Sequence, residues 1–127
     1  MNKVLVVEDN ELNLKLFYDL LIIKNCEVLV SKDGVGVINL SLKEKPDLIL
    51  MDIQLNGISG LDLIKTLKAN KETKHIPIIA ITAFAMKNDE ATIIQSGCDM
   101  YLAKPVSINN FFEAIAKFIN INSSKSA

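Results

Sequence analysis

Five polar residues of the sequence end or follow short apolar runs, where packing alone does not require them. Glu8 and Asp9 follow "VLVV", Asp52 ends "DLILMD", Thr82 ends "IPIIAIT", and Lys104 follows "MYLA". Two neighbouring carboxylates at a strand end repel each other, because unit charges about 4 Å apart interact by roughly 4 kcal/mol at an effective dielectric constant of about 20. We therefore expect a positive charge close to the acidic pair.

The three carboxylates would also need a cation if the fold brought them together. Without one, at least one of their pKa values would be forced upward. Mg²⁺ keeps several waters and takes only a few carboxylates, so it suits a shallow open site better than Ca²⁺ does. We expect Glu8, Asp9 and Asp52 to hold Mg²⁺ jointly, with Mn²⁺ as an alternative ion.

Asp52 stands alone at the end of its apolar run, which makes it the natural nucleophile. A carboxylate can attack phosphorus to give an aspartyl phosphate, and a metal and a lysine offset the charge on the phosphoryl oxygens. Thr82 is predicted to hydrogen-bond one phosphoryl oxygen and Lys104 to pair with another. Taken singly, each residue has a simpler explanation, such as a turn, a helix cap or packing, so the prediction depends on the whole set.

The apolar runs alternate with helical patterns along the chain, which predicts a (βα)5 order. Continuous apolar strands indicate an α/β fold, a doubly wound five-stranded parallel sheet with helices on both faces. In the strand order 2-1-3-4-5, the first and third strands adjoin at the switch point, where such sheets bind ligands. The helical patterns predict an apolar side with Val35, Ile38 and Leu42 after the second strand, and with Ala91, Ile93 and Ile94 after the fourth.

The composition predicts one domain at 1–121 and a flexible polar C-terminal tail at 122–127, with no output domain. The formal net charge is −1, without the basic stripe that nucleic acid or an anionic membrane would need. No apolar run is long enough for a signal peptide or membrane insertion, so we expect a cytoplasmic protein. Cys26, Cys98 and His75 are too isolated to form a disulfide framework or a metal site.

The motifs "VLVVEDN", "PDLILMDIQL", "GLDLIK", "IPIIAITA" and "GCDMYLAKP" together resemble the receiver domain of bacterial response regulators. This family has the CheY-like, flavodoxin-like fold and is the phosphate-accepting half of two-component signalling. The segments "LMDIQL", "HIPIIAITAFAMK" and "YLAKPVS" are especially similar in sequence to single-domain cell-cycle regulators in this family. One departure is Asn56, which stands where many receivers carry proline.

The resemblance implies further roles at the site. The metal would take the backbone carbonyl of Gln54 as well as the three carboxylates, and the peptide bond before Pro105 would be cis. Tyr101 falls at the switch aromatic that responds to Thr82. Gln54 and Phe84 are assigned to phosphate lifetime. The Phe84 ring would exclude attacking water, although packing or a partner surface also explains it.

By resemblance, the chain is a single-domain response regulator in a phosphorelay, with a role in cell-cycle control. Its phosphoryl donor would be a histidine kinase or a histidine phosphotransferase, and its output a downstream kinase or regulator bound on the face of the fourth helix, fifth strand and fifth helix. We expect no ordinary enzyme activity, only self-catalysed phosphorylation and dephosphorylation.

Three other functions are compatible with the fold. A flavodoxin-like electron carrier is disfavoured because "EDNEL" would repel the flavin phosphate, and an aspartyl phosphatase because Gln54 replaces its second aspartate. An interaction module with the receiver fold that is never phosphorylated stays open.

Overall fold

A five-stranded parallel sheet forms the centre of the protein in the computed structural model, which describes residues 1–83 and 87–121. The strands are β1 (Lys3–Val7), β2 (Glu27–Ser31), β3 (Leu48–Asp52), β4 (Ile78–Thr82) and β5 (Met100–Ala103). Their order is β2-β1-β3-β4-β5, with every neighbouring pair parallel. The predicted strand order is confirmed, and the carboxyl ends of β1 and β3 lie next to each other.

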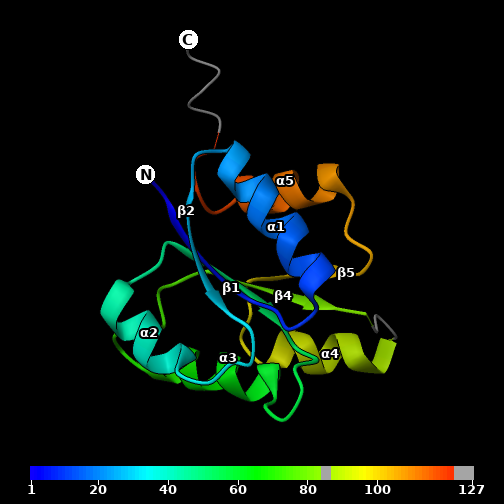
Figure 1. Ribbon diagram of the computed structural model, residues 1–127. Coiled ribbons are helices and arrows are strands. Elements are labelled where there is room, and N and C mark those ends of the chain that lie inside the picture. Colours follow the sequence, from blue (N-terminus) through cyan, green and yellow to red (C-terminus); the bar gives the residue numbers. More distant parts are fainter. Residues whose placement is uncertain (84–86, 122–127) are drawn as a thin grey trace.

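Helices cover both faces of the sheet. They are α1 (Glu11–Ile23), α2 (Val37–Glu44), α3 (Gly60–Ala69), α4 (Lys87–Gln95) and α5 (Ile108–Ala116). α1 and α5 lie on one face, and α2, α3 and α4 lie on the other (Figure 1). No helix in 1–83 or 87–121 has both the length and the apolar character needed to cross a membrane.

Two apolar cores explain why the central strands read as unbroken apolar runs. Val4 and Val6 of β1 pack into the core under α1 and α5, while Leu5 and Val7 pack into the core under α2 and α3. Successive side chains of a strand point to opposite faces, so a strand covered on both sides is apolar at every position. β3 and β4 are buried at every residue for the same reason.

The predicted apolar sides of two helices are wrong in part. Val35 is 67% exposed and precedes α2, which begins only after Gly36 in a left-handed conformation and buries Val37 instead. Ile93 is buried as predicted, but Ala91 is exposed and Ile94 is 53% exposed. Val35 lies before the first turn of its helix, and Ile94 directly follows the buried Ile93, so it points about 100° around the helix axis from that residue. The predicted tail at 122–127 lies outside the described residues.

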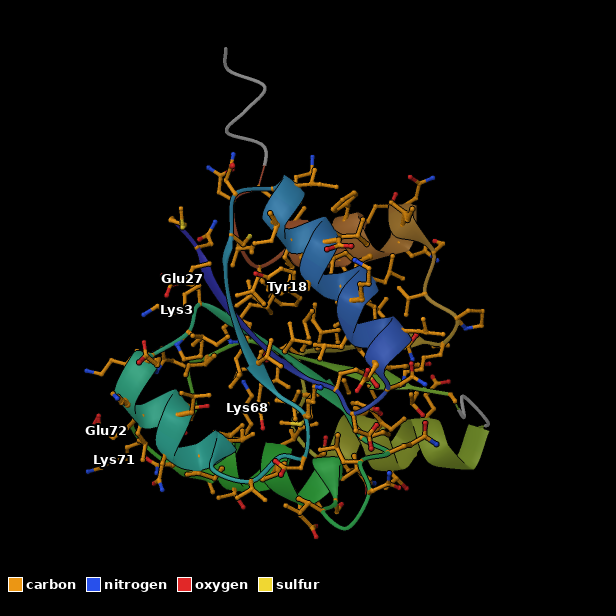
Figure 2. The ribbon with its side chains drawn as sticks, in the orientation of Figure 1. Lys3, Tyr18, Glu27, Lys68, Lys71 and Glu72 are labelled. Atoms are coloured by element: carbon orange, nitrogen blue, oxygen red, sulfur yellow. The ribbon has the colours of Figure 1, made fainter. Side chains whose placement is uncertain are left out.

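Ion pairs fasten the amino-terminal edge of the sheet, opposite the carboxylate cluster. Lys68 of α3 contacts Asp99 at 2.8 Å and donates to the Ile76 carbonyl at 2.9 Å, which ties the starts of β4 and β5 together. Lys3 pairs with Glu44 at 3.1 Å, and Figure 2 shows it near Glu27, its register partner on β2. These contacts stabilise the sheet without adding positive charge at its functional edge.

The start of α3 packs directly on the residue that ends β3. Ser59 caps the helix by accepting a hydrogen bond from the Asp62 amide at 3.2 Å. A Cβ atom on Gly60 would lie 2.5 Å from the Asp52 carbonyl oxygen and 2.5 Å from Ile53 Cα. Only glycine therefore allows α3 to approach the backbone of Asp52 this closely.

We predict that Gly60→Ala destabilises the protein by about 3 kcal/mol, because the new methyl group meets backbone atoms that cannot rotate away. Gly57→Ala is the matched control, since its Cβ would meet nothing within 4 Å and only its φ of +83° opposes the change. That strain costs about 1 kcal/mol. Urea unfolding measures both values, and equal losses would show that helix α3 adjusts freely.

Candidate functional site

Three carboxylates converge where β1 and β3 end. Glu8 and Asp9 follow β1, Asp52 is the last residue of β3, and their ligand oxygens lie within 4.8 Å of one another. Glu8 is 1% exposed and Asp52 is 2% exposed, whereas Asp9 is half-buried. The parallel sheet thus gathers acids that are far apart in the sequence at a single edge.

Lys104 supplies positive charge to this cluster. Its Nζ atom lies 3.2 Å from Oδ2 of Asp52 and 3.3 Å from Oε2 of Glu8, and its side chain is 16% exposed. The backbone N–H of Lys104 donates to the Thr82 carbonyl at 2.7 Å, and the Lys104–Pro105 peptide bond is cis. The loop after β5 is therefore hydrogen-bonded to the end of β4, and its lysine side chain contacts the carboxylates that end β3 and follow β1.

Thr82 occupies the carboxyl end of β4, next to β3. It is 1% exposed, and its neighbour Ile81 is the register partner of Asp52. The hydroxyl and the ammonium therefore belong to the same sheet edge as the carboxylates. The structure brings together all five polar residues that the sequence singled out.

Two backbone amides of the loop after β3 donate hydrogen bonds to carboxylates of the site. The Gln54 amide donates to Oδ1 of Asp52 at 2.9 Å, and the Asn56 amide donates to Oδ2 of Asp9 at 3.1 Å. The Gln54 side chain also takes part, since its Oε1 accepts a hydrogen bond from the Ala83 amide at 2.8 Å. A proline at position 56 could not hold Asp9 in this way, because it has no N–H.

Burial makes the negative charge of the Glu8 carboxylate unfavourable, which raises its pKa. Desolvation raises the pKa of Glu8 from 4.5 to about 7, and a hydrogen bond with Asp52 and its charge act in the same direction. The Asn10 amide and Lys104 oppose the rise. Among the described residues, no group donates a hydrogen bond to the buried Oε1 of Glu8, although Nζ of Lys104 lies 3.3 Å from it.

These observations fit a small divalent cation. Three carboxylates lie together, the Lys104 ammonium pairs with two of them, and one buried carboxylate oxygen has no hydrogen bond from the described part of the chain. Hard oxygen ligands of this kind, in small number and near solvent, are what Mg²⁺ takes in proteins. Glu8, Asp9 and Asp52 are thus the residues that could hold it.

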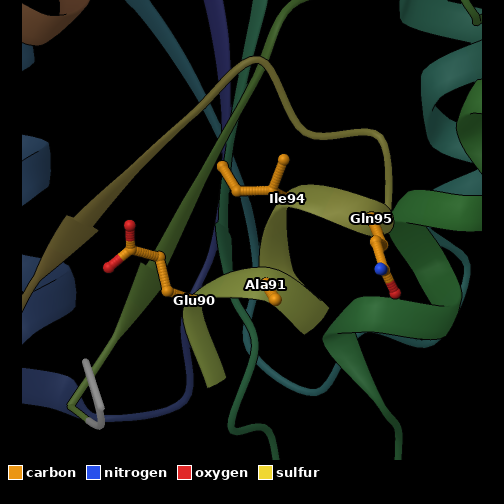
Figure 3. A pocket seen from close by; sticks show the side chains of 4 residues that line it. All are labelled: Glu90, Ala91, Ile94 and Gln95. Atoms are coloured by element: carbon orange, nitrogen blue, oxygen red, sulfur yellow. The ribbon is translucent and has the colours of Figure 1, made fainter. Parts of the chain in front are cut away.

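Tyr101 lies on β5, away from the acids. It is half-buried against the core under α2 and α3. A hydrogen bond to Glu90 raises the pKa of the Tyr101 hydroxyl, with smaller contributions from burial and the charge of Glu90. Figure 3 shows Glu90 on α4 at a shallow pocket that Ala91, Ile94 and Gln95 also line. Phe84, assigned to phosphate lifetime, lies outside the described residues.

Sequence reasoning missed the backbone donors around the acids. Asn10 N–H donates to Oε2 of Glu8 at 3.1 Å, and Glu8 N–H donates to the Ser31 carbonyl at 3.1 Å, so β2 also supports the site. Every residue except proline has a backbone N–H, so the residue types in the sequence could not reveal these contacts. The N-cap preference for asparagine before an apolar helical run concerns only the Asn10 side chain, which accepts a hydrogen bond from the Asn13 amide at the start of α1.

We predict that the metal-free protein loses stability as the pH rises from 4.5 to 7, by on the order of 1–3 kcal/mol. The pKa of Glu8 is higher in the folded than in the unfolded state, so its proton stabilises the fold fully below 4.5 and is lost as the pH passes through about 7. Urea unfolding in EDTA at several pH values measures this loss.

Glu8→Gln should flatten this pH profile, because glutamine does not titrate. Glu72→Gln is the matched control, since Glu72 is exposed and far from the cluster along the chain. A Glu8→Gln profile that parallels the unsubstituted protein would show that Glu8 takes up no extra proton on folding.

Curated relatives of the chain share nearly half of its residues. It is 49% identical over 116 residues to the polar-differentiation response regulator DivK of Brucella anthropi, an alignment that covers 91% of this chain and 94% of the relative. The DivK proteins of Brucella abortus match with the same identity and coverage. The predicted resemblance to single-domain cell-cycle regulators is thereby supported at the level of the whole sequence.

Solved structures agree with this similarity. The receiver domain of the sensor histidine kinase PA1611 of Pseudomonas aeruginosa, solved with a magnesium ion in its active site cleft, is 29% identical with a TM-score of 0.85 and covers 96% of this chain and 98% of that one. The chemotaxis protein CheY4 of Vibrio cholerae, 21% identical, shares the fold with a TM-score of 0.86 over 94% and 99% of the two chains.

The sequence model described as the response regulator receiver domain matches residues 4–116, which extend from the second residue of β1 to the end of α5. The match includes the acids, the hydroxyl and the lysine at the carboxyl edge of the sheet. The chain belongs to the response regulator receiver domain family.

Proposed function

We propose that the protein accepts a phosphoryl group on Asp52 from a phosphohistidine of a histidine kinase or a histidine phosphotransferase. The main support is that the ammonium of Lys104 lies 3.2–3.3 Å from carboxylate oxygens of two buried residues, Glu8 and Asp52. A buried acidic cluster at this edge is costly for folding alone. It is well suited to a reaction that places three further anionic oxygens beside Lys104.

In the transfer, a carboxylate oxygen of Asp52 forms a bond to phosphorus while the bond from phosphorus to the donor imidazole nitrogen breaks. The electron pair of that bond stays on the imidazole, which takes a proton from water. Lys104 pairs with one phosphoryl oxygen, and the Thr82 hydroxyl hydrogen-bonds another. The protein supplies positioning and electrostatic stabilisation, as in other phosphoryl transfers.

Mg²⁺ is the ion we assign to the acidic cluster, held by Glu8, Asp9, Asp52 and the Gln54 carbonyl, with Mn²⁺ as an alternative. When bound, it offsets negative charge on the phosphoryl oxygens. The magnesium ion in the related PA1611 receiver domain supports this assignment. So do the three ligand oxygens within 4.8 Å.

Output is proposed to be binding, on the face of α4, β5 and α5, to a downstream kinase or regulator. The DivK relatives are named for polar differentiation, which supports a role in cell-cycle control for this chain as well. We propose self-catalysed phosphorylation and dephosphorylation as its only chemistry. The alternative, an interaction module that is never phosphorylated, is separated from this proposal by the labelling experiment below.

We predict that incubation with acetyl phosphate and Mg²⁺ adds one phosphoryl group, and that Asp52→Asn abolishes the addition without unfolding the protein. The amide cannot act as the nucleophile. Intact-mass spectrometry measures the product, circular dichroism checks the fold, and Asp19→Asn, on the exposed side of α1, is the matched control. Unmodified protein at saturating acetyl phosphate would favour the interaction module, and full labelling of Asp52→Asn would place the acceptor elsewhere.

We predict that Thr82 transmits phosphorylation to Tyr101. A hydroxyl that turns toward a phosphoryl group vacates space into which the ring can rotate, which would break the Tyr101–Glu90 hydrogen bond. The sequence has two tyrosines and no tryptophan, so in a Tyr18→Phe background Tyr101 is the only strong emitter. Beryllofluoride, a phosphoryl mimic, should change its emission in this background and leave it almost unchanged when Thr82→Ala is added.

The control for this prediction is Thr66→Ala, which removes a hydroxyl from the exposed side of α3. Fluorine NMR shows directly whether beryllofluoride is bound in each variant. Equal emission changes with and without Thr82, at equal occupancy, would contradict the coupling.

A further inference from the structure

The Gln54 side chain crosses from the loop after β3 to the end of β4. Its backbone N–H holds Oδ1 of Asp52 at 2.9 Å, and its Oε1 accepts the Ala83 N–H at 2.8 Å. Gln54 therefore contacts both the nucleophile and the residue after Thr82. The two contacts span the rim between β3 and β4, which are adjacent strands.

The Ala83 amide follows the end of β4, the strand next to the one that ends at Asp52, and the Gln54 side chain occupies this donor. A backbone N–H makes one good hydrogen bond at a time, so another acceptor can take this donor only if Oε1 leaves. Ala83 is exposed, so water can satisfy its amide when Gln54 is absent. Folding therefore does not require this hydrogen bond, unlike those of the buried strands.

We infer that the amide oxygen of Gln54 stands in for a phosphoryl oxygen in the unmodified protein and must be displaced when Asp52 is phosphorylated. The inference rests on the proposed function and adds a competitor within the same site. It makes Gln54 a positioning residue that acts through the Ala83 amide. Its side chain opposes phosphorylation by occupying a donor that the product needs.

The test compares Gln54→Met with the unsubstituted protein. Methionine has a similar length but only a weak sulfur acceptor, so the Ala83 amide should be freed without a new clash. In ¹⁵N-labelled protein without phosphate, the Ala83 amide proton should shift upfield and exchange faster. The concentration of beryllofluoride that half-saturates Asp52 at saturating Mg²⁺ should fall by about three- to tenfold, the size of one net hydrogen bond.

Gln95→Met is the matched control, because it makes the same change at the other glutamine of the sequence, on the exposed side of α4. It should leave both readouts unchanged. A half-saturating concentration in Gln54→Met that equals or exceeds that of the unsubstituted protein overturns the inference, since the side chain would then be neutral or would support the bound mimic. An unchanged Ala83 amide signal overturns it as well.

Failure of the proposed function gives a different pattern. The unsubstituted protein would then bind no beryllofluoride at Asp52 and gain no phosphoryl group from acetyl phosphate. That result removes the inference together with the function. If beryllofluoride binds the unsubstituted protein and Gln54→Met equally well, the inference is wrong but the proposed function stands.

Discussion

The site depends on one ammonium group shared by two buried carboxylates. Lys104 reaches Glu8 and Asp52 from a loop that follows the edge strand β5, so the contact requires β5, β4, β3 and β1 to stand in their observed order. Removing one partner of such a group would leave a buried charge uncompensated, which is strongly destabilising. The acidic edge therefore tolerates its excess negative charge only because the sheet is complete.

The fold and the five polar positions could be predicted because they follow from one geometric rule. Parallel strands end at the same edge, so residues that end buried strands must gather there, and type and order along the chain suffice to find Glu8, Asp52 and Lys104. Side-chain faces of short helices were less predictable. Ile94 directly follows the buried Ile93, yet it is exposed, because successive residues of a helix point about 100° apart.

The contacts that escaped prediction are made by backbone donors. The amides of Gln54, Asn56 and Ala83 bind side-chain oxygens at 2.8–3.1 Å, and no residue type encodes an amide. Asn56 is instructive, because in the sequence it is only a departure from the proline of many receivers. The structure gives it a chemical consequence, since its N–H holds Asp9.

The rim of the site is already hydrogen-bonded in the absence of phosphate. Asp9, Asp52 and the Gln54 side chain each accept an amide proton, so a phosphoryl group would have to exchange partners rather than fill open positions. An exchange of hydrogen bonds has a small net free energy, because each bond gained is offset by one lost. A small difference between two states is what allows a single modification to shift their populations. If a phosphoryl group takes the Ala83 amide from Gln54, the exchange therefore adds only a small term to the free-energy difference between the unmodified and the modified state.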